Sequence, residues 1–167
     1  MNLWRKFTNM IVEKSLTFGK GAVLTITNAN GSKVLAGLGA EILAAARTLV
    51  ASDLSKTFYL NLAGGFATTM PAPVLGGKVK FIVQTAPTTA YTIVTLGSAN
   101  IMKGHVLSAD LNAASDGDIE TSGGDTFTFV ANKAVAGDWV EFESDGTSWF
   151  ASARVSVFDA ATITTAS

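Results

Sequence analysis

Two kinds of hydrophobic spacing divide the chain. Residues 2–14 place Leu3, Phe7 and Ile11 at helical intervals among polar side chains, which predicts a short amphipathic helix. From residue 57 onward, short runs of β-branched and aromatic residues are separated by turn residues, and this pattern is typical of all-β sandwiches and barrels. The sequence therefore predicts a mainly β protein, with an antiparallel β-sandwich or barrel body and a short N-terminal helical and hairpin extension.

The extension contains two further predicted elements. Asn30-Gly31 is a favoured two-residue hairpin turn, and residues 17–28 and 33–36 on either side of it have strand-like composition. Residues 40–49 (AEILAAARTL) predict a second helix, because three consecutive alanines favour helix formation.

Strand patterns follow one another through the rest of the chain. The predicted strands are 57–62, 66–70, 78–84, 91–95, 101–106, 126–131, 139–144, 149–157 and 161–165. Asp145-Gly146, between two of these strands, is the clearest hairpin signal in the protein. We therefore expect an N-terminal basic extension over residues 1–51 and a β domain over residues 52–167.

Composition excludes several classes of site. The 167 residues include no cysteine, which excludes disulfides, thiolate zinc sites and iron–sulfur clusters, and only one histidine, His105. The net charge of −1 conceals an asymmetry, since residues 1–56 carry seven basic and three acidic residues, whereas residues 57–167 carry five basic and ten acidic ones. The basic residues are too dispersed for a nucleic-acid-binding surface, so we expect no nucleic-acid partner.

Neither export nor membrane insertion is predicted. Arg5, Lys6 and Lys14 interrupt any apolar stretch of the kind found in signal peptides. The uncharged runs 57–77 and 81–102 reach membrane-spanning length, but their proline, threonine, asparagine and glycine content favours β structure. We expect no membrane partner.

The acidic segment Asp116-Gly117-Asp118-Ile119-Glu120 raises the question of calcium, because alternating carboxylates can surround a hard cation. The EF-hand pattern fails, with Thr121 at the required glycine and Phe127 at the required glutamate. The pattern favours an exposed acidic loop and leaves calcium binding open. His105 serves a hydrolase only if a serine and an aspartate lie beside it, so no catalytic, cofactor-binding or metal-binding residue is predicted.

Three tryptophans have different surroundings. Trp139 and Trp149 flank the Asp145-Gly146 turn, where they form either a sugar-stacking platform or part of the β core, and the core is favoured because each buries a large area. Trp4, near a terminus in the predicted helix, is better suited to anchoring on a partner surface.

A series of short segments in the β domain resembles a known family. They are KTFYLNLAGGFATTMPAP (56–73), FIV (81–83), TTAYTIV (88–94), AGDWVEF (136–142) and SDGTSW (144–149). Together they are similar to a β domain found in virion proteins of tailed bacteriophages, the capsid decoration (cement) proteins and head-fibre modules. The similarity covers about residues 52–165.

This resemblance implies a structural virion protein on the outer capsid surface, made in the host cytoplasm. It implies a homotrimer bound to the major capsid protein, without enzymatic activity or a cofactor. The body has few charged residues, which agrees with assembly, because a surface with so few charges is expected to be covered by other copies of the chain or by a shell. The alternative is a head-fibre or tail-fibre adhesin module, in which Trp149 contacts a host surface glycan.

The basic N-terminal segment is the expected capsid attachment element. The expected apolar anchors are Trp4, Phe7 and Ile11. The expected basic residues, which would face carboxylates on the capsid, are Arg5, Lys6 and Lys14. The alternative is that this helix packs on its own β body or on its trimer partners.

Overall fold

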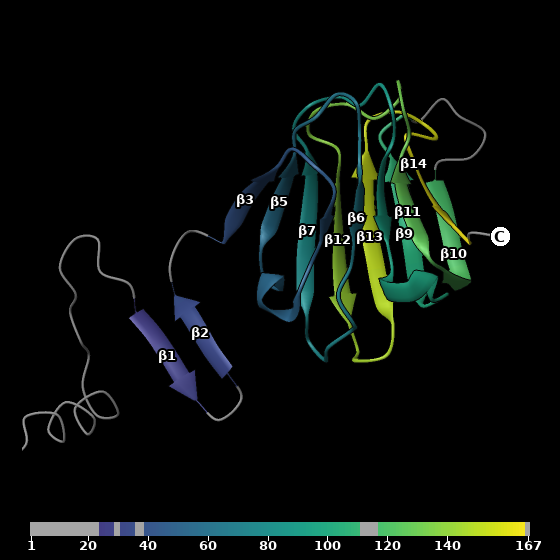
Figure 1. Ribbon diagram of the computed structural model, residues 1–167. Coiled ribbons are helices and arrows are strands. Elements are labelled where there is room, and N and C mark those ends of the chain that lie inside the picture. The colour runs from purple at the N-terminus through teal and green to yellow at the C-terminus, as the bar shows by residue number, and fades with distance from the viewer. Residues whose placement is uncertain (1–23, 29–30, 36–38, 111–116, 166–167) are drawn as a thin grey trace, which may run out of the picture. The chain divides into compact units, whose positions relative to one another are not determined.

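A computed structural model gives the architecture (Figure 1). It describes residues 24–28, 31–35, 39–110 and 117–165. The chain divides into two compact units, Met1–Leu38 and Gly39–Ser167.

The first unit contains one described hairpin. β1 (Leu24–Asn28) pairs antiparallel with β2 (Gly31–Leu35), and Asn28 lies opposite Gly31. The predicted hairpin is confirmed, but β1 is shorter than predicted, and β2 begins at Gly31, a residue that the sequence places in the turn. The helix predicted over 2–14 lies outside the described residues.

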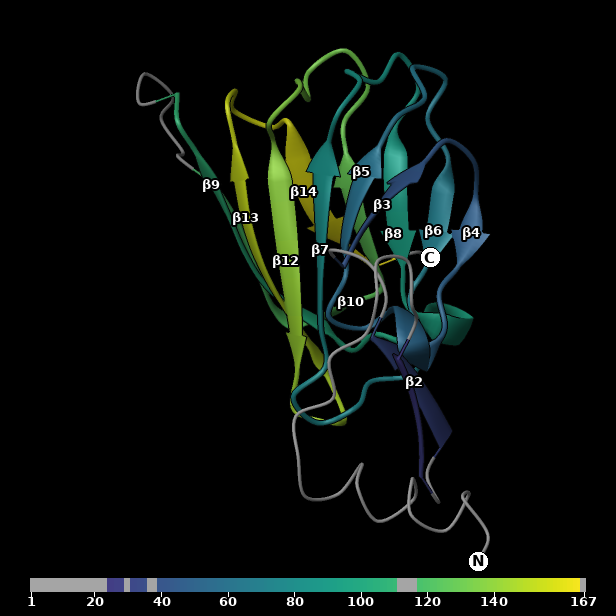
Figure 2. The same ribbon diagram turned by 90° about the vertical axis from the view of Figure 1, so that its left-hand side faces the viewer.

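The second unit, the body, is built from two β-sheets that lie face to face (Figures 1 and 2). The seven-stranded sheet contains, in spatial order, β10 (Gly117–Gly124), β9 (Met102–Ser108), β13 (Trp149–Val155), β12 (Trp139–Ser144), β7 (Lys78–Val83), β5 (Thr57–Leu60) and β3 (Ala40–Leu43). The five-stranded sheet contains β14 (Ala161–Thr164), β11 (Thr126–Phe129), β8 (Tyr91–Val94), β6 (Ala67–Thr69) and β4 (Arg47–Thr48). Two 3₁₀ turns, η1 (Ala51–Asp53) and η2 (Leu96–Ser98), connect strands. The mainly β, sandwich-like body is confirmed.

The sheets are mixed, whereas an antiparallel body was predicted. β12 is antiparallel to both its neighbours, but β3, β5 and β7 run parallel, as do β4, β6 and β8. The reason is the route of the chain, which alternates between the two sheets from β3 to β8. Each return to the same sheet passes through the opposite layer, and such a crossover allows parallel neighbours.

The helix predicted over 40–49 is wrong. Ala40–Leu43 forms β3, which pairs with β5, and Arg47–Thr48 forms β4, which pairs with β6. Helix propensity is worth less than about 1 kcal/mol per residue, so backbone pairing with two sheets outweighs it. The three alanines instead carry the chain from one sheet to the other, and β3 and β4 therefore belong to the body.

The core lies between the sheets and is rich in aromatic residues. Phe58, Phe81 and Phe142 from the seven-stranded sheet are fully buried, as are Phe127 and Phe129 from the five-stranded sheet. The rings of Phe127 and Phe142 meet across the two layers at a centroid distance of 5.9 Å in an edge-on arrangement. Alternate residues of each strand point into this core, which leaves the other half on two outer faces.

Candidate interaction surface

The outer face of the seven-stranded sheet carries an apolar row. Strand pairing aligns Ile42 of β3 with Tyr59 of β5, then with Ile82 of β7, and then with Trp139 of β12. Ile42 is 58% exposed and the other three are half-buried. Paired residues on one face of a sheet lie side by side, so the apolar row is continuous across four strands.

Charged side chains flank the apolar row on β7 and β12. The ammonium group of Lys80 lies 4.1 Å from the ring centroid of Trp139, a cation–π contact. Lys78 pairs with Glu143 at 3.1 Å, and both side chains are more than half exposed. Such an exposed ion pair contributes little to stability but sets the local charge balance.

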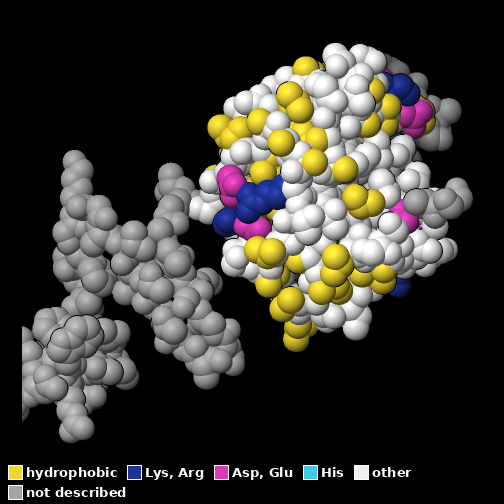
Figure 3. Space-filling model, viewed as in Figure 1, with side chains coloured by type: hydrophobic (Ala, Val, Ile, Leu, Met, Phe, Trp, Pro, Cys, Tyr) yellow, Lys and Arg dark blue, Asp and Glu magenta, His cyan; other side chains and the backbone are white. Residues whose placement is uncertain are grey.

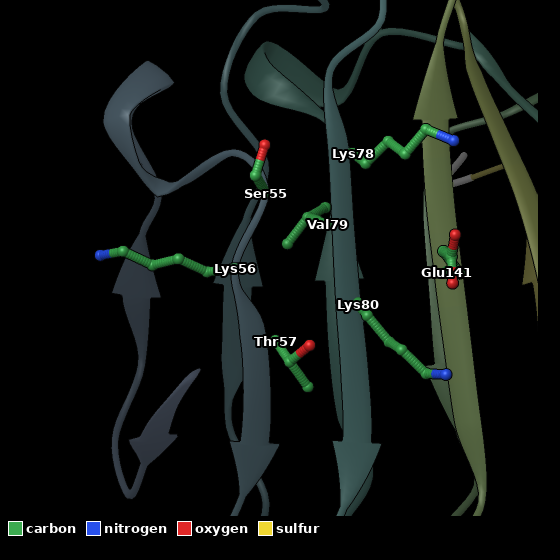
Figure 4. A pocket seen from close by; sticks show the side chains of 7 residues that line it. All are labelled: Ser55, Lys56, Thr57, Lys78, Val79, Lys80 and Glu141. Atoms are coloured by element: carbon green, nitrogen blue, oxygen red, sulfur yellow. The ribbon is translucent and has the colours of Figure 1, made fainter. Parts of the chain in front are cut away.

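A shallow depression of about 260 Å³ lies beside these lysines (Figure 4). Its lining residues are Ser55, Lys56, Thr57, Lys78, Val79, Lys80 and Glu141. In Figure 4 the side chains of Lys78 and Lys80 flank Glu141, whereas Lys56 points away. Lys56 instead binds Asp53 at 2.7 Å, an interaction that raises the pKa of the Lys56 ammonium group despite partial burial. Each lysine of the depression thus already has a partner within the body: Lys56 contacts Asp53, Lys78 contacts Glu143, and Lys80 contacts Trp139.

A second charged cluster ties together the β3 and β4 edges. Arg47 bridges Glu41 and Asp53, and Lys56 bridges the same two carboxylates. The side chain of Asp53 is 3% exposed, and it also accepts a hydrogen bond from the Val50 N–H at 3.0 Å. Because its members come from β3, β4, η1 and the residue just before β5, this four-residue ion network holds these elements together on one side of the body.

The outer face of the five-stranded sheet is different in character. It is lined by threonines that are exposed or half-buried: Thr48, Thr69, Thr92, Thr126, Thr128, Thr162 and Thr164. Figure 3 views this side of the molecule and shows charged groups at its margins, with almost none across the middle. A threonine face of this kind has no net charge with which to select a partner.

The two tryptophans of the hairpin lie on opposite faces. Trp149 is fully buried, which confirms the core prediction for that residue. Trp139 is half-buried on the outer face, where Arg154 is its neighbour on β13. A shared sugar-stacking platform is therefore excluded, and Trp149 is not available to contact a glycan.

The described part of the acidic segment, residues 117–120, is a strand and not the predicted loop, and Asp116 lies outside the described residues. Gly117–Gly124 forms β10 and pairs with β9, so Ile119 lies opposite His105. The Glu120 carboxylate accepts hydrogen bonds from the Ser122 and Gly123 N–H groups. In the described part of the chain, no three acidic, histidine or cysteine side chains are grouped so that they can hold a metal ion. Pairing with β9 accounts for the strand, since a neighbouring strand stabilises a segment whose own composition favours a loop.

Other predicted site residues fall in two groups. Trp4, Arg5, Lys6, Phe7, Ile11 and Lys14 lie outside the described residues. His105 is exposed on β9, and its cross-strand neighbours are Ser152 and Ile119. The runs 57–77 and 81–102 form strands and turns, and no helix within the described ranges has the length and apolarity to span a membrane.

Sequence reasoning missed several exposed side chains on β9, β10 and β13. Leu107, Ile119 and Phe150 are 47%, 73% and 45% exposed. Alternation within each strand signals that such residues face outward, but the parallel pairing that brings β9 beside β13 has no local signal.

Neither the protein-family models nor the curated proteins contain a match to this chain.

Proposed function

We propose that this protein is a structural virion protein of a tailed bacteriophage, a capsid decoration (cement) protein that binds the outer surface of the head. The observation that carries the proposal is the set of large apolar side chains exposed on a rigid β body, among them Ile42, Leu107 and Ile119. Exposed apolar clusters on a stable domain mark surfaces that bind other macromolecules. The resemblance of residues 52–165 to virion β domains directs the proposal to the phage capsid.

The proposed mechanism is mechanical. The protein, as a homotrimer, contacts neighbouring copies of the major capsid protein and buries surface against each of them. A ligand that binds only the closed shell stabilises that state by mass action, so many bound copies together oppose opening. No bond is made or broken, no cofactor is used, and neither nucleic acid nor membrane is a partner.

One argument for the alternative function, a fibre adhesin, does not hold. It depended on Trp149 as a glycan contact, and this side chain is fully buried. The exposed aromatic residue of the hairpin strands is Phe150, which belongs to a mixed apolar and basic surface.

The number of copies in the virion tests the proposal. Quantitative mass spectrometry of virions, purified from the phage that encodes this chain, should find a copy number comparable to that of the major capsid protein. A tail-fibre protein of the same particles provides the low-copy reference. Absence from the particles, or a copy number equal to that of the tail fibre, would contradict the proposal.

A further inference from the structure

One edge of the seven-stranded sheet presents apolar and basic side chains together on its outer face. The apolar members lie on three adjacent strands, β10, β9 and β13. With the two basic residues among them they form what we call the basic apolar patch: Lys103, Leu107, Ile119, Phe150 and Arg154.

Strand register makes the patch continuous. Lys103 of β9 is paired with Phe150 of β13, and Leu107 is paired with Arg154. Ile119 of β10 is joined to the same surface through its pairing with His105, which lies between Lys103 and Leu107. Directly paired side chains on one face of a sheet are about 5 Å apart, so these residues form a single surface.

The two basic residues of the patch form no ion pair within the described part of the chain. No described carboxylate lies within ion-pair distance of Lys103 or Arg154, whereas Lys78, Lys133 and Arg47 each have a partner. On the neighbouring strand β12, Glu141 and Glu143 lie opposite Ser152 and Phe150, and Glu143 already pairs with Lys78. Arginine and aromatic residues beside exposed aliphatic ones are the composition of protein interfaces.

We infer that the basic apolar patch is the surface by which the body docks on its shell protein, and that it fits a partner surface combining carboxylates with apolar side chains. The inference rests on the proposed function and assigns the contact to the body. A symmetric contact with a second copy would bring Lys103 and Arg154 of both copies together, and such like charges repel across an interface. The threonine face on the other sheet lacks the charge needed to select an acidic partner.

Charge reversal tests the electrostatic part. Arg154→Glu and Lys103→Glu should each weaken binding to shells produced without this chain by about tenfold, and should reduce its salt dependence. Lys133→Glu, with the same change in net charge, should bind like the wild type. Circular dichroism and thermal unfolding confirm that each variant is folded. Equal binding by Arg154→Glu and Lys133→Glu overturns the inference.

Photo-cross-linking tests the location. A benzophenone amino acid replaces Ile119, which is 73% exposed, and in a control it replaces Leu75, which is 79% exposed in a loop. A product between position 119 and the shell protein, at an acidic segment identified by mass spectrometry, supports the inference. No product from position 119 in particles that carry the chain, or a product only with a second copy, overturns it while the proposed function stands. Absence of the chain from the particles overturns both.

Two other anionic partners are outcomes of the same experiment. The wild type and Arg154→Glu are compared for binding to phosphatidylserine vesicles and to duplex DNA. Binding of either probe that Arg154→Glu abolishes, without an effect on shell binding, reassigns the patch and overturns the inference.

Discussion

Individual residues decide how closely the strands of the body pack. Gly104 of β9 lies opposite Ala151 of β13 in a parallel pair, with a φ of 150°. A methyl group added at Gly104 would lie 2.0 Å from the Ala151 carbonyl oxygen, a backbone atom that cannot move without breaking the strand pair. Only glycine permits this approach, because it has no Cβ.

Gly104→Ala should therefore destabilise the body by more than about 3 kcal/mol, because it combines a strained backbone with a steric clash. Gly137→Ala is the matched control: its φ is 101°, but an added methyl group meets no atom within 4 Å. We expect it to cost only about 1 kcal/mol. Urea denaturation measures both, and equal losses would show that backbone conformation alone requires glycine at Gly104.

Among the elements, the four-residue ion network has the clearest role. Glu41 lies on β3 and Arg47 on β4, the edge strands of the two sheets, so their ion pair ties together the open side of the sandwich. Burial by itself raises the pKa of Asp53, but hydrogen bonds from Lys56 and the Val50 N–H, together with the charge of Arg47, lower it below 3.8.

This lowered pKa predicts an acid-sensitive edge. A carboxylate with a depressed pKa in the folded state contributes stability above its unfolded pKa, and this contribution is lost as the pH falls through the folded value. The free energy of unfolding should therefore decrease below about pH 4. Asp53→Asn should be less stable than the wild type at pH 7 and should show a weaker decrease in acid.

Asp159→Asn provides the control, because Asp159 is half exposed and its contact with Lys133 is a weak 3.7 Å ion pair. It should keep the acid dependence of the wild type. Thermal unfolding followed between pH 2.5 and 7 gives the comparison, and an Asp53→Asn curve parallel to that of the wild type would contradict the assignment.

On the scale of the whole molecule, the second unit has a hydrophobic core of its own. Among the residues whose burial the structure describes, the large buried side chains, including Trp149, Tyr91 and the five core phenylalanines, lie within Gly39–Ser167. Alternation of the chain between the sheets makes each layer depend on the other, so the body should unfold as one cooperative unit.

A fragment of residues 39–167 should accordingly fold without the N-terminal unit. We expect a single cooperative transition in urea, with a midpoint close to that of the full chain. A fragment of residues 52–167 is the control, since it lacks β3, β4 and the Glu41 and Arg47 side chains, and it should be markedly less stable. Equal stability of the two fragments would show that the β3 and β4 edges contribute nothing.

The sequence by itself determined most of the strands and the fold class. Runs of β-branched and aromatic residues between turn residues predict nine of the body strands, including Trp139–Ser144 with the same bounds as β12, and Asp145-Gly146 predicts its hairpin with β13. The Asp145 carboxylate accepts hydrogen bonds from the Ser148 and Thr147 N–H groups, which also lower its pKa. These features are local, since a strand's own residue composition and the residues of a turn carry the signal.

Only the tertiary structure decided what depends on distant neighbours. The segment 40–49 contains two strands, and residues 117–120 of the acidic segment belong to β10, because other strands pair with them and pairing outweighs local propensity. The different positions of Trp139 and Trp149, and the gathering of Lys103, Phe150 and Arg154 on one surface, follow from sheet order and register. Periodicity tells which face of a strand is exposed to solvent, but only the packing of the sheets tells which strands share that face.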